Sequence, residues 1–252
     1  MRLTRLHVDA ALAPGDVLEL PPDTATHVAK VLRVRSGDPV VLFNGDGRES
    51  AAVIDAVRGS RVSVAVGESR LIDRESPLPV TLLQSIPRGD RMDFIVQKAT
   101  ELGVARIVPI FSERSVVRLD HKQAESKCTH WRAIAASACE QCGRNRLPIV
   151  DAPRRLLDYL GAATITGTRL LLDPDGGSAA RGAGGGAADD RIDGAAAVEI
   201  AVGPEGGFAA AELDAFAVSG FLPVRLGPRI LRTETAALAA LVWLQTRSGD
   251  LR

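Results

Sequence analysis

From residue 80 onward, short apolar runs typical of strands alternate with segments of helical periodicity. The run "VTLLQSI" precedes a helix that should end at Gly103, because glycine suits the left-handed conformation that follows many helices. Strands that alternate with helices indicate an α/β fold with a mostly parallel sheet covered on both faces. Strands are expected at 80–86, 105–111, 168–173, 197–202 and 221–226, and helices at 91–102, 121–142, 210–217 and 233–247.

The first seventy residues carry four short β-branched runs, each bounded by Gly, Pro or Asp. Turns of the hairpin type, "NGDG" and "RGS", separate the last three runs. One helix interrupts them, with Asp23 as its expected N-cap and Val28, Val31 and Leu32 as its apolar face. This pattern predicts a small β-barrel with one helix. The four runs lie at 16–20, 38–43, 49–57 and 61–66.

The segment "DRESPLP", residues 73–79, is charged and then broken by prolines. Neither a helix nor a central strand can pass through such a segment. We therefore expect a first domain over residues 1–72, a linker over 73–79 and a second domain over 80–252.

A second irregular stretch lies between Pro174 and Ala197 and is rich in Gly and Ala. It has no periodicity and is interpreted as a flexible loop insertion. Its Gly182, Gly184 and Ala187 match the spacing of a dinucleotide fingerprint. That fingerprint requires a strand running directly into a helix, which is not expected here, so the match favours low complexity over a nucleotide site.

Composition limits the other possible functions. The chain has 31 basic and 31 acidic residues, so a nucleic-acid site would have to be a local patch. We expect a cytoplasmic protein, because no window resembles a membrane span or a signal peptide. The three cysteines are expected to be reduced. Cys139 and Cys142 form a C-x-x-C at a helix C-terminus, which indicates buried thiols and no metal site.

The segment "GPEGG", residues 203–207, turns an apolar strand into a helix. Its three glycines allow close approach of the backbone to a ligand. No lysine follows to bind a phosphate, and Glu205 would repel one. A ligand with a cationic or hydroxyl-bearing part is therefore favoured over a phosphate.

The segment "LGPRILRTETA" joins the last strand to the last helix. Ile230 and Leu231 could wall an apolar slot for a flat heterocycle such as adenine, with Arg232 at its rim. Equally, the two apolar side chains could plug the core while the arginines are solvated. These residues do not decide between the two alternatives.

The last helix is expected to start at Thr233 as its cap, with Glu234 and Thr235 in its electropositive first turn. Residues 236–244 are apolar nearly all round, so both sides of the helix should be buried. A sheet covers one side only, which suggests that a partner subunit covers the other.

Five motifs in this order and separation resemble a known family: "QSIPRGDRMDFIVQKATELGV", "FSERSV", "EQCGRNRLP", "GPEGGF" and "LGPRILRTETA". They are similar to the bacterial 16S ribosomal RNA uridine N3-methyltransferases of the SPOUT class. The N-terminal "HVAKVLRVRSGD" resembles the PUA-like RNA-binding barrel of the same family. The resemblance implies a trefoil-knotted α/β domain, in which the last segment of the sheet threads a loop, preceded by a PUA-like β-barrel.

The resemblance also implies S-adenosylmethionine as cofactor, bound in the knot, and a homodimer in which the partner helps to complete each active site. The implied substrate is 16S ribosomal RNA in an assembled small ribosomal subunit. Carried over by position, the implied cofactor contacts are Leu172, Gly203, Glu205, Gly206, Leu226, Gly227, Ile230, Leu231, Thr235 and Ala236.

Methylation at N3 of uridine requires that the N3 proton leaves and that the resulting negative charge is stabilised. Arg232 is the candidate for this stabilisation, and it cannot easily act as a base because guanidinium stays protonated. Glu234 is a candidate base, with hydroxide as the alternative.

RNA contact is expected through a basic surface on the barrel, and the 4% aromatic content favours recognition by shape and phosphate. The candidate residues are Arg2, Arg5, Lys30, Arg33 and Arg35. Two other functions stay open: a non-catalytic RNA-binding or assembly factor with the same fold, and a nucleotide-dependent enzyme of the ordinary doubly wound type.

Overall fold

The computed structural model describes residues 3–162, 167–176 and 191–251. The chain divides into two compact units. Residues 136–147 group with the N-terminal part of the chain, although they are distant from it in sequence. The first unit contains Met1–Glu75 and Ala136–Leu147, and the second contains Ser76–Ala135 and Pro148–Arg252.

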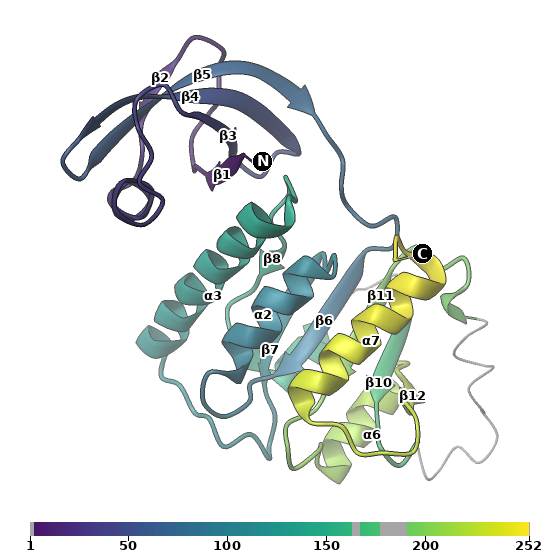
Figure 1. The fold of residues 1–252 in the computed structure, drawn as a ribbon. Coiled ribbons are helices and arrows are strands. Elements are labelled where there is room, and N and C mark those ends of the chain that lie inside the picture. The colour runs from purple at the N-terminus through teal and green to yellow at the C-terminus, as the bar shows by residue number, and fades with distance from the viewer. Residues whose placement is uncertain (1–2, 163–166, 177–190, 252) are drawn as a thin grey trace. The chain divides into compact units, whose positions relative to one another are not determined.

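Five strands form the sheet of the first unit (Figure 1). Their hydrogen-bonded order runs from β1 to β2 as β1-β3-β4-β5-β2. β1 is parallel to β3, and the other pairs are antiparallel; hairpin turns join β3 to β4 and β4 to β5. The four predicted strands are present, and β1 is an additional one. The strands are β1 (Thr4–His7), β2 (Val17–Glu19), β3 (Pro39–Phe43), β4 (Arg48–Arg58) and β5 (Arg61–Leu71).

The helical segment of the first unit consists of α1 and a π-helical turn, η1. Asp23 is not the predicted N-cap: Pro21 holds that position, and Asp23 lies in the first turn. The expected apolar face is also incomplete, because Val28 is buried whereas Val31 and Leu32 are exposed. A π-helical turn rotates residues out of the spacing of an α-helix, which accounts for this difference. The elements are α1 (Pro22–Thr26) and η1 (His27–Val31).

The sheet of the second unit has the order β12-β10-β11-β6-β7-β8, with β9 also pairing with β7. All of these pairs are parallel, which confirms the predicted parallel sheet. The strands are β6 (Val80–Ser85), β7 (Arg106–Phe111), β8 (Ile149–Val150), β9 (Arg154–Arg155), β10 (Thr168–Leu172), β11 (Val198–Val202) and β12 (Leu222–Val224).

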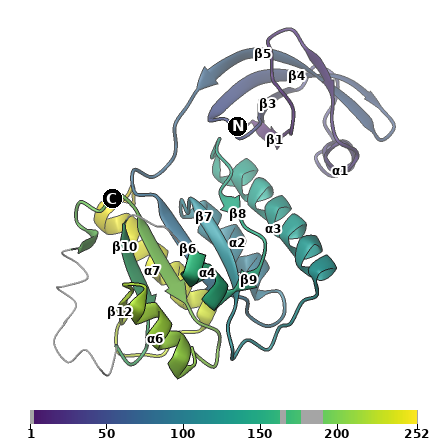
Figure 2. The same ribbon diagram turned by 180° about the vertical axis from the view of Figure 1, so that it is seen from behind.

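Helices cover both faces of this sheet, with α2, α3 and α7 on one face and α4 and α6 on the other (Figures 1 and 2). Successive residues of a strand point to opposite faces of the sheet and so pack in different hydrophobic cores. Leu82 packs in the cluster that contains Leu241 of α7, and Leu83 packs in the cluster that contains Phe216 of α6. Among the described residues, no helix combines the length and apolar character of a membrane span. The helices are α2 (Arg91–Glu101), α3 (His121–Cys142), α4 (Leu156–Ala162), α6 (Ala210–Val218) and α7 (Thr233–Ser248).

The end of the Gly- and Ala-rich insertion is packed, which corrects its interpretation as a flexible loop throughout. Ile192 is fully buried in the core that includes α7, and the Asp193 carboxylate pairs with Arg247 at 2.8 Å. Burial of this single large apolar side chain anchors the chain just before β11. Gly182, Gly184 and Ala187 lie outside the described residues. Residues 177–190 between β10 and β11 also lie outside the described residues, and the implied knot stays a prediction.

The three cysteines are free thiols, as predicted. Cys128 and Cys139 are buried, and Cys142 is half-buried. A hydrogen bond with Cys142, together with burial, raises the pKa of the Cys139 thiol. Such a thiol is unreactive, in agreement with a structural role. The described residues contain no group of three His, Cys, Asp or Glu side chains suited to a metal ion.

Candidate active site

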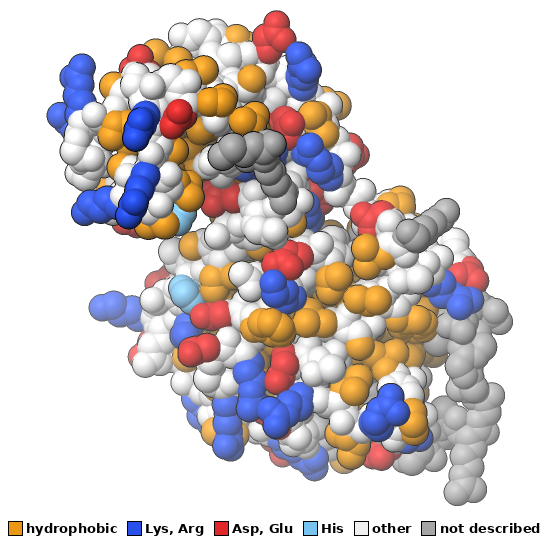
Figure 3. All heavy atoms as spheres, viewed as in Figure 1, with side chains coloured by type: hydrophobic (Ala, Val, Ile, Leu, Met, Phe, Trp, Pro, Cys, Tyr) orange, Lys and Arg blue, Asp and Glu red, His pale blue; other side chains and the backbone are white. Residues whose placement is uncertain are grey.

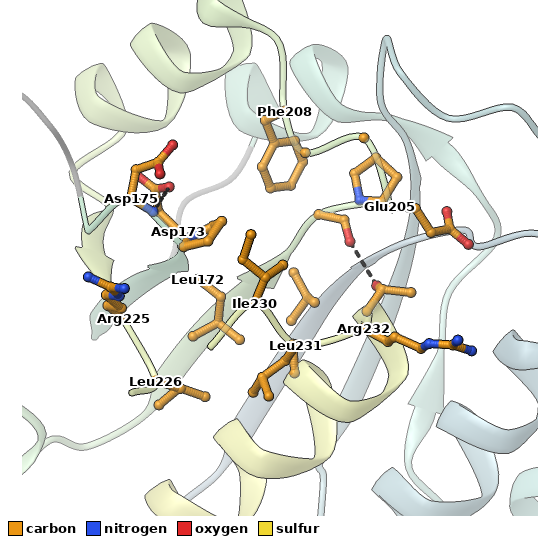
Figure 4. Close-up of a pocket in the computed structure, with 18 of the residues that line it drawn as sticks. Leu172, Asp173, Asp175, Glu205, Phe208, Arg225, Leu226, Ile230, Leu231 and Arg232 are labelled. Atoms are coloured by element: carbon orange, nitrogen blue, oxygen red, sulfur yellow. Dashed lines mark hydrogen bonds between the residues drawn. The ribbon is translucent and has the colours of Figure 1, made fainter. Parts of the chain in front are cut away.

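A cavity of about 500 Å³ opens at the carboxyl ends of β10, β11 and β12 (Figure 4). These strands are neighbours in the sheet, so the loops that follow them meet at one edge. Ligands of open parallel sheets typically bind at this edge. Most of the lining comes from the segments 172–175, 202–208, 224–226 and 229–233, with Arg114, Leu213 and Ala236 in addition.

The middle of the cavity is apolar, with Leu172, Leu226, Ile230 and Leu231 around it (Figure 4). Ile230 is 85% exposed, which is unusual for a large aliphatic side chain. It therefore does not plug the core. Ile230 and Leu231 line the cavity instead, so Ile230 does not fit the core-plug alternative, and the adenine slot stays a prediction.

The loop after β11 depends on its glycines. A Cβ atom at Gly203 would lie 3.2 Å from the ring of Phe208, and one at Gly206 would lie 3.5 Å from Cβ of Arg114. Gly207 has a φ of +66°, and its N–H donates to the carbonyl of Pro204 at 2.9 Å. Glycine is the residue that adopts this conformation without strain. The loop thus presents bare backbone to the cavity.

Thr233 links this loop to the last helix. It is not the predicted N-cap: Arg232 holds that position in an extended conformation, and no side chain caps the helix. The buried Thr233 hydroxyl donates to the carbonyl of Gly203 at 2.7 Å and accepts from Nε2 of Gln84 at 3.0 Å. One hydroxyl therefore connects β6, the loop after β11 and the start of α7.

Arg91, the first residue of α2, lies between two of the predicted acidic site residues. It forms an ion pair with Glu205, and its Nε lies 3.9 Å from Oε1 of Glu234. Glu234 is absent from the cavity lining, and its Oε2 is buried without a hydrogen-bond partner among the described residues. The Glu234 carboxylate is thus turned toward Arg91 and away from the ligand space.

Five of the charged lining residues lie at two opposite ends of the cavity. Asp173, Asp175 and Arg225 lie at one end, and Glu205 and Arg232 lie at the other (Figure 4). Arg232 is exposed and forms no ion pair with any residue that the structure describes. Its guanidinium is therefore available to a ligand.

Most of the predicted cofactor and catalytic residues meet in this cavity. Those that line it are Leu172, Gly203, Glu205, Gly206, Leu226, Ile230, Leu231, Arg232 and Ala236, and those that do not are Gly227, Glu234 and Thr235. The sequence-based selection missed Arg114, Asp173, Asp175 and Phe208. Asp173 was detectable as the first polar residue after an apolar strand, and Arg114 lies in the motif "FSERSV".

The predicted RNA-binding residues differ in their accessibility. Lys30, Arg33 and Arg35 are exposed, and Arg2 lies outside the described residues. Arg5 requires a correction, because its side chain is only 7% exposed. Its guanidinium pairs with Glu49 at 2.6 Å and donates to Oδ1 of Asn145 at 2.5 Å. Arg5 therefore stabilises the first unit and is not available to RNA.

Comparison with known proteins gives the same picture along the whole chain. A family model described as RNA methyltransferase domain matches residues 74–245, and one described as RNA methyltransferase PUA domain matches residues 20–66. The chain is 31% identical to ribosomal RNA small subunit methyltransferase E of Buchnera aphidicola subsp. Schizaphis graminum, over 99% of this chain and 98% of that protein.

Two solved structures are similar over the full length of both chains. One is a methyltransferase from Legionella pneumophila in complex with the cofactor SAM, with a TM-score of 0.91 and 39% identity. The other is a ribosomal RNA small subunit methyltransferase E from Neisseria gonorrhoeae bound to S-adenosyl methionine, with a TM-score of 0.84 and 36% identity. With its two family domains, its cavity and these full-length relatives, the chain belongs to the RNA methyltransferase family that includes ribosomal RNA small subunit methyltransferase E.

Proposed function

We propose that the protein transfers the methyl group of S-adenosylmethionine to N3 of a uridine in 16S ribosomal RNA of the small ribosomal subunit. The observation that carries the proposal is the cavity where the loops after β10, β11 and β12 meet. The solved relatives from Legionella pneumophila and Neisseria gonorrhoeae, which match over the full chain, have S-adenosylmethionine bound. The proposed substrate places the protein in the cytoplasm, where ribosomes are assembled.

The cavity suits this cofactor in size and chemistry. A volume of about 500 Å³ lies in the range of small-molecule sites. The apolar slot around Ile230 and Leu231 would hold the adenine, and the backbone of residues 203–207 would supply hydrogen bonds. Asp173 and Asp175 would face a hydroxyl-bearing or cationic part. When bound, the cofactor supplies an electrophilic methyl group.

The protein must favour a deprotonated uridine, because N3 is a poor nucleophile while it carries its proton. Arg232 is the proposed stabiliser of the negative charge that spreads onto the uracil oxygens. Glu234 is still proposed as a base, although its carboxylate lies beside Arg91 and outside the cavity lining. Hydroxide is the alternative acceptor of the proton.

A homodimer is the proposed assembly. One side of α7 packs in the core through residues such as Leu241 and Leu244, while Val242 on another side is 43% exposed. Phe94 of the neighbouring α2 is 46% exposed, and apolar side chains gather over α2 and α7 (Figure 3). A second copy would cover this surface. Light scattering should give the mass of a dimer for the wild type and a lower mass for Val242→Glu.

The RNA-binding part of the proposal involves Lys30, Arg33 and Arg35, with Arg2, on a domain over residues 1–72. The proposed linker over 73–79 separates it from the catalytic domain over 80–252. Limited proteolysis that cuts between the two domains would support this division. Cuts confined to other sites would contradict it.

The decisive experiment is mass spectrometry of ribosomal RNA from cells that lack the protein. Loss of one N3-methyluridine from 16S RNA, restored by the wild-type gene, is the expected result. Calorimetry with S-adenosylmethionine complements it, because a non-catalytic assembly factor need not bind the cofactor. An unchanged modification profile would refute the proposed function.

A further inference from the structure

We propose that Arg114 is a second catalytic cation, which acts together with Arg232 on the uracil ring of the substrate. This inference rests on the proposed function and extends it by a residue from a fourth loop. Arg114 lies in the segment that follows β7, whereas the other loops of the cavity follow β10, β11 and β12.

Arg114 is an exposed residue that the loop beneath it orients. Its Nη1 donates to the carbonyl of Gly206 at 3.0 Å. Its aliphatic part lies across Gly206, with Cβ and Cδ 3.5 and 3.8 Å from where a Cβ atom of residue 206 would be. A guanidinium has five N–H donors, so several of them stay available after this bond. Arg114 thus reaches over "GPEGG" into the cavity.

The backbone on both sides of Arg114 is also held. The N–H of Glu113 donates to Oε1 of Glu212 at 2.7 Å, and the buried hydroxyls of Ser112 and Ser115 lie 2.9 Å apart. The Ser85 hydroxyl donates to that of Ser112 at 3.0 Å. Such anchoring places a side chain before the substrate arrives, which is what electrostatic catalysis requires.

Arg114 and Arg91 differ in their ion pairs. Arg91 is neutralised by Glu205 and Glu234, whereas Arg114 and Arg232 form no ion pair with any described residue. Arg114 contacts Gly206, which is adjacent to Glu205, and Glu205 lies at the same end of the cavity as Arg232 (Figure 4). This end therefore carries two cations without carboxylate partners.

Two cations match the chemistry of the substrate. When the N3–H bond breaks and the proton leaves to solvent hydroxide, the negative charge spreads onto O2 and O4, on opposite sides of N3. The N3 electron pair then forms a bond to the methyl carbon while the bond from that carbon to sulfur breaks. The products are N3-methyluridine, S-adenosylhomocysteine and water. One arginine for each oxygen would stabilise the anion symmetrically.

The first test compares Arg114→Gln, Arg114→Lys and Arg232→Gln in methylation of small subunits from cells that lack the protein. Arg118→Gln is the matched control, because Arg118 lies in the same loop, is exposed and does not line the cavity. Each Gln variant at 114 or 232 should lose about 100-fold in kcat, and Lys should restore part of it at 114. Calorimetry should show S-adenosylmethionine affinity within about twofold of wild type.

The second test measures binding without turnover. Small subunits that contain 5-fluorouridine, whose N3 proton is more acidic, are bound in the presence of S-adenosylhomocysteine. Wild-type affinity should rise as pH increases through N3 ionisation, because the anionic base is preferred, and Arg114→Gln should lose this rise. A retained rise, or a cofactor affinity that falls in parallel with kcat, would show that Arg114 only supports Gly206. Absence of methylation by the wild type would instead refute the proposed function.

Discussion

Replacing Thr233 by valine should destabilise the segments that form the cavity, because the Thr233 hydroxyl links three of them by hydrogen bonds. Valine keeps the shape of threonine but cannot donate to the carbonyl of Gly203 or accept from Gln84. Gln84 Nε2 retains a bond to the carbonyl of Ser85 at 2.8 Å, so the main loss is at Gly203. A hydrogen bond contributes about 1 kcal/mol, and an unsatisfied buried acceptor costs about 1–3 kcal/mol.

These values predict a loss of about 2 kcal/mol in the free energy of unfolding, measured by urea titration. For a domain of this size the loss corresponds to about 4–8 °C in melting temperature. Affinity for S-adenosylmethionine should fall as well, because Gly203 lines the cavity. Thr246→Val is the matched control, since Thr246 is exposed on the same helix. If Thr233→Val is no less stable than this control, the bridging role of the hydroxyl is wrong.

Four further substitutions address other parts of the fold. Arg5→Gln removes one ion pair of Glu49 and should lower the free energy of unfolding by about 2 kcal/mol; the loss is limited because Arg74 still pairs with Glu49 at 2.9 Å. Lys30→Gln should leave the melting temperature unchanged and weaken the salt dependence of RNA binding. Ile192→Ala should cost about 2–4 kcal/mol in urea unfolding, whereas a flexible insertion would give no effect. Burial raises the pKa of Glu140, so wild-type stability should decrease as pH rises from the ordinary value of 4.5 through the raised one. Glu140→Gln should lack this decrease in melting curves recorded across that interval, and parallel pH profiles would contradict the assignment.

The second unit was predictable from sequence because its strands and helices have clear, different periodicities. β6 and β11 are buried along almost their whole length, although each includes polar residues, and the sequence located both within one or two residues. β8 and β9 are two residues each and carry no pattern that could be read. α1 deviated because Pro22 starts the helix earlier than the expected cap at Asp23.

The site was predictable as a set of loops but not as a set of contacts. The glycines of residues 203–207 and the apolar pair Ile230 and Leu231 indicated a ligand site, and the cavity contains them. The sequence does not indicate which side chains, distant from one another along the chain, form ion pairs and hydrogen bonds. Arg5 was predicted to lie on the surface, but its guanidinium donates hydrogen bonds to Glu49 and Asn145, which are remote in sequence.

The charges around the cavity favour stabilising an anion over removing a proton. Glu234 was the candidate base, but it lies beside Arg91 and does not line the cavity. Glu205 is paired with the same arginine. The described lining residues include no histidine, whereas Arg114 and Arg232 line the cavity and form no ion pair with a described residue. In the proposed mechanism, stabilising the uridine anion would leave solvent hydroxide as the proton acceptor. The rate should then rise with pH until the bound uridine is ionised, with no second step from a protein base.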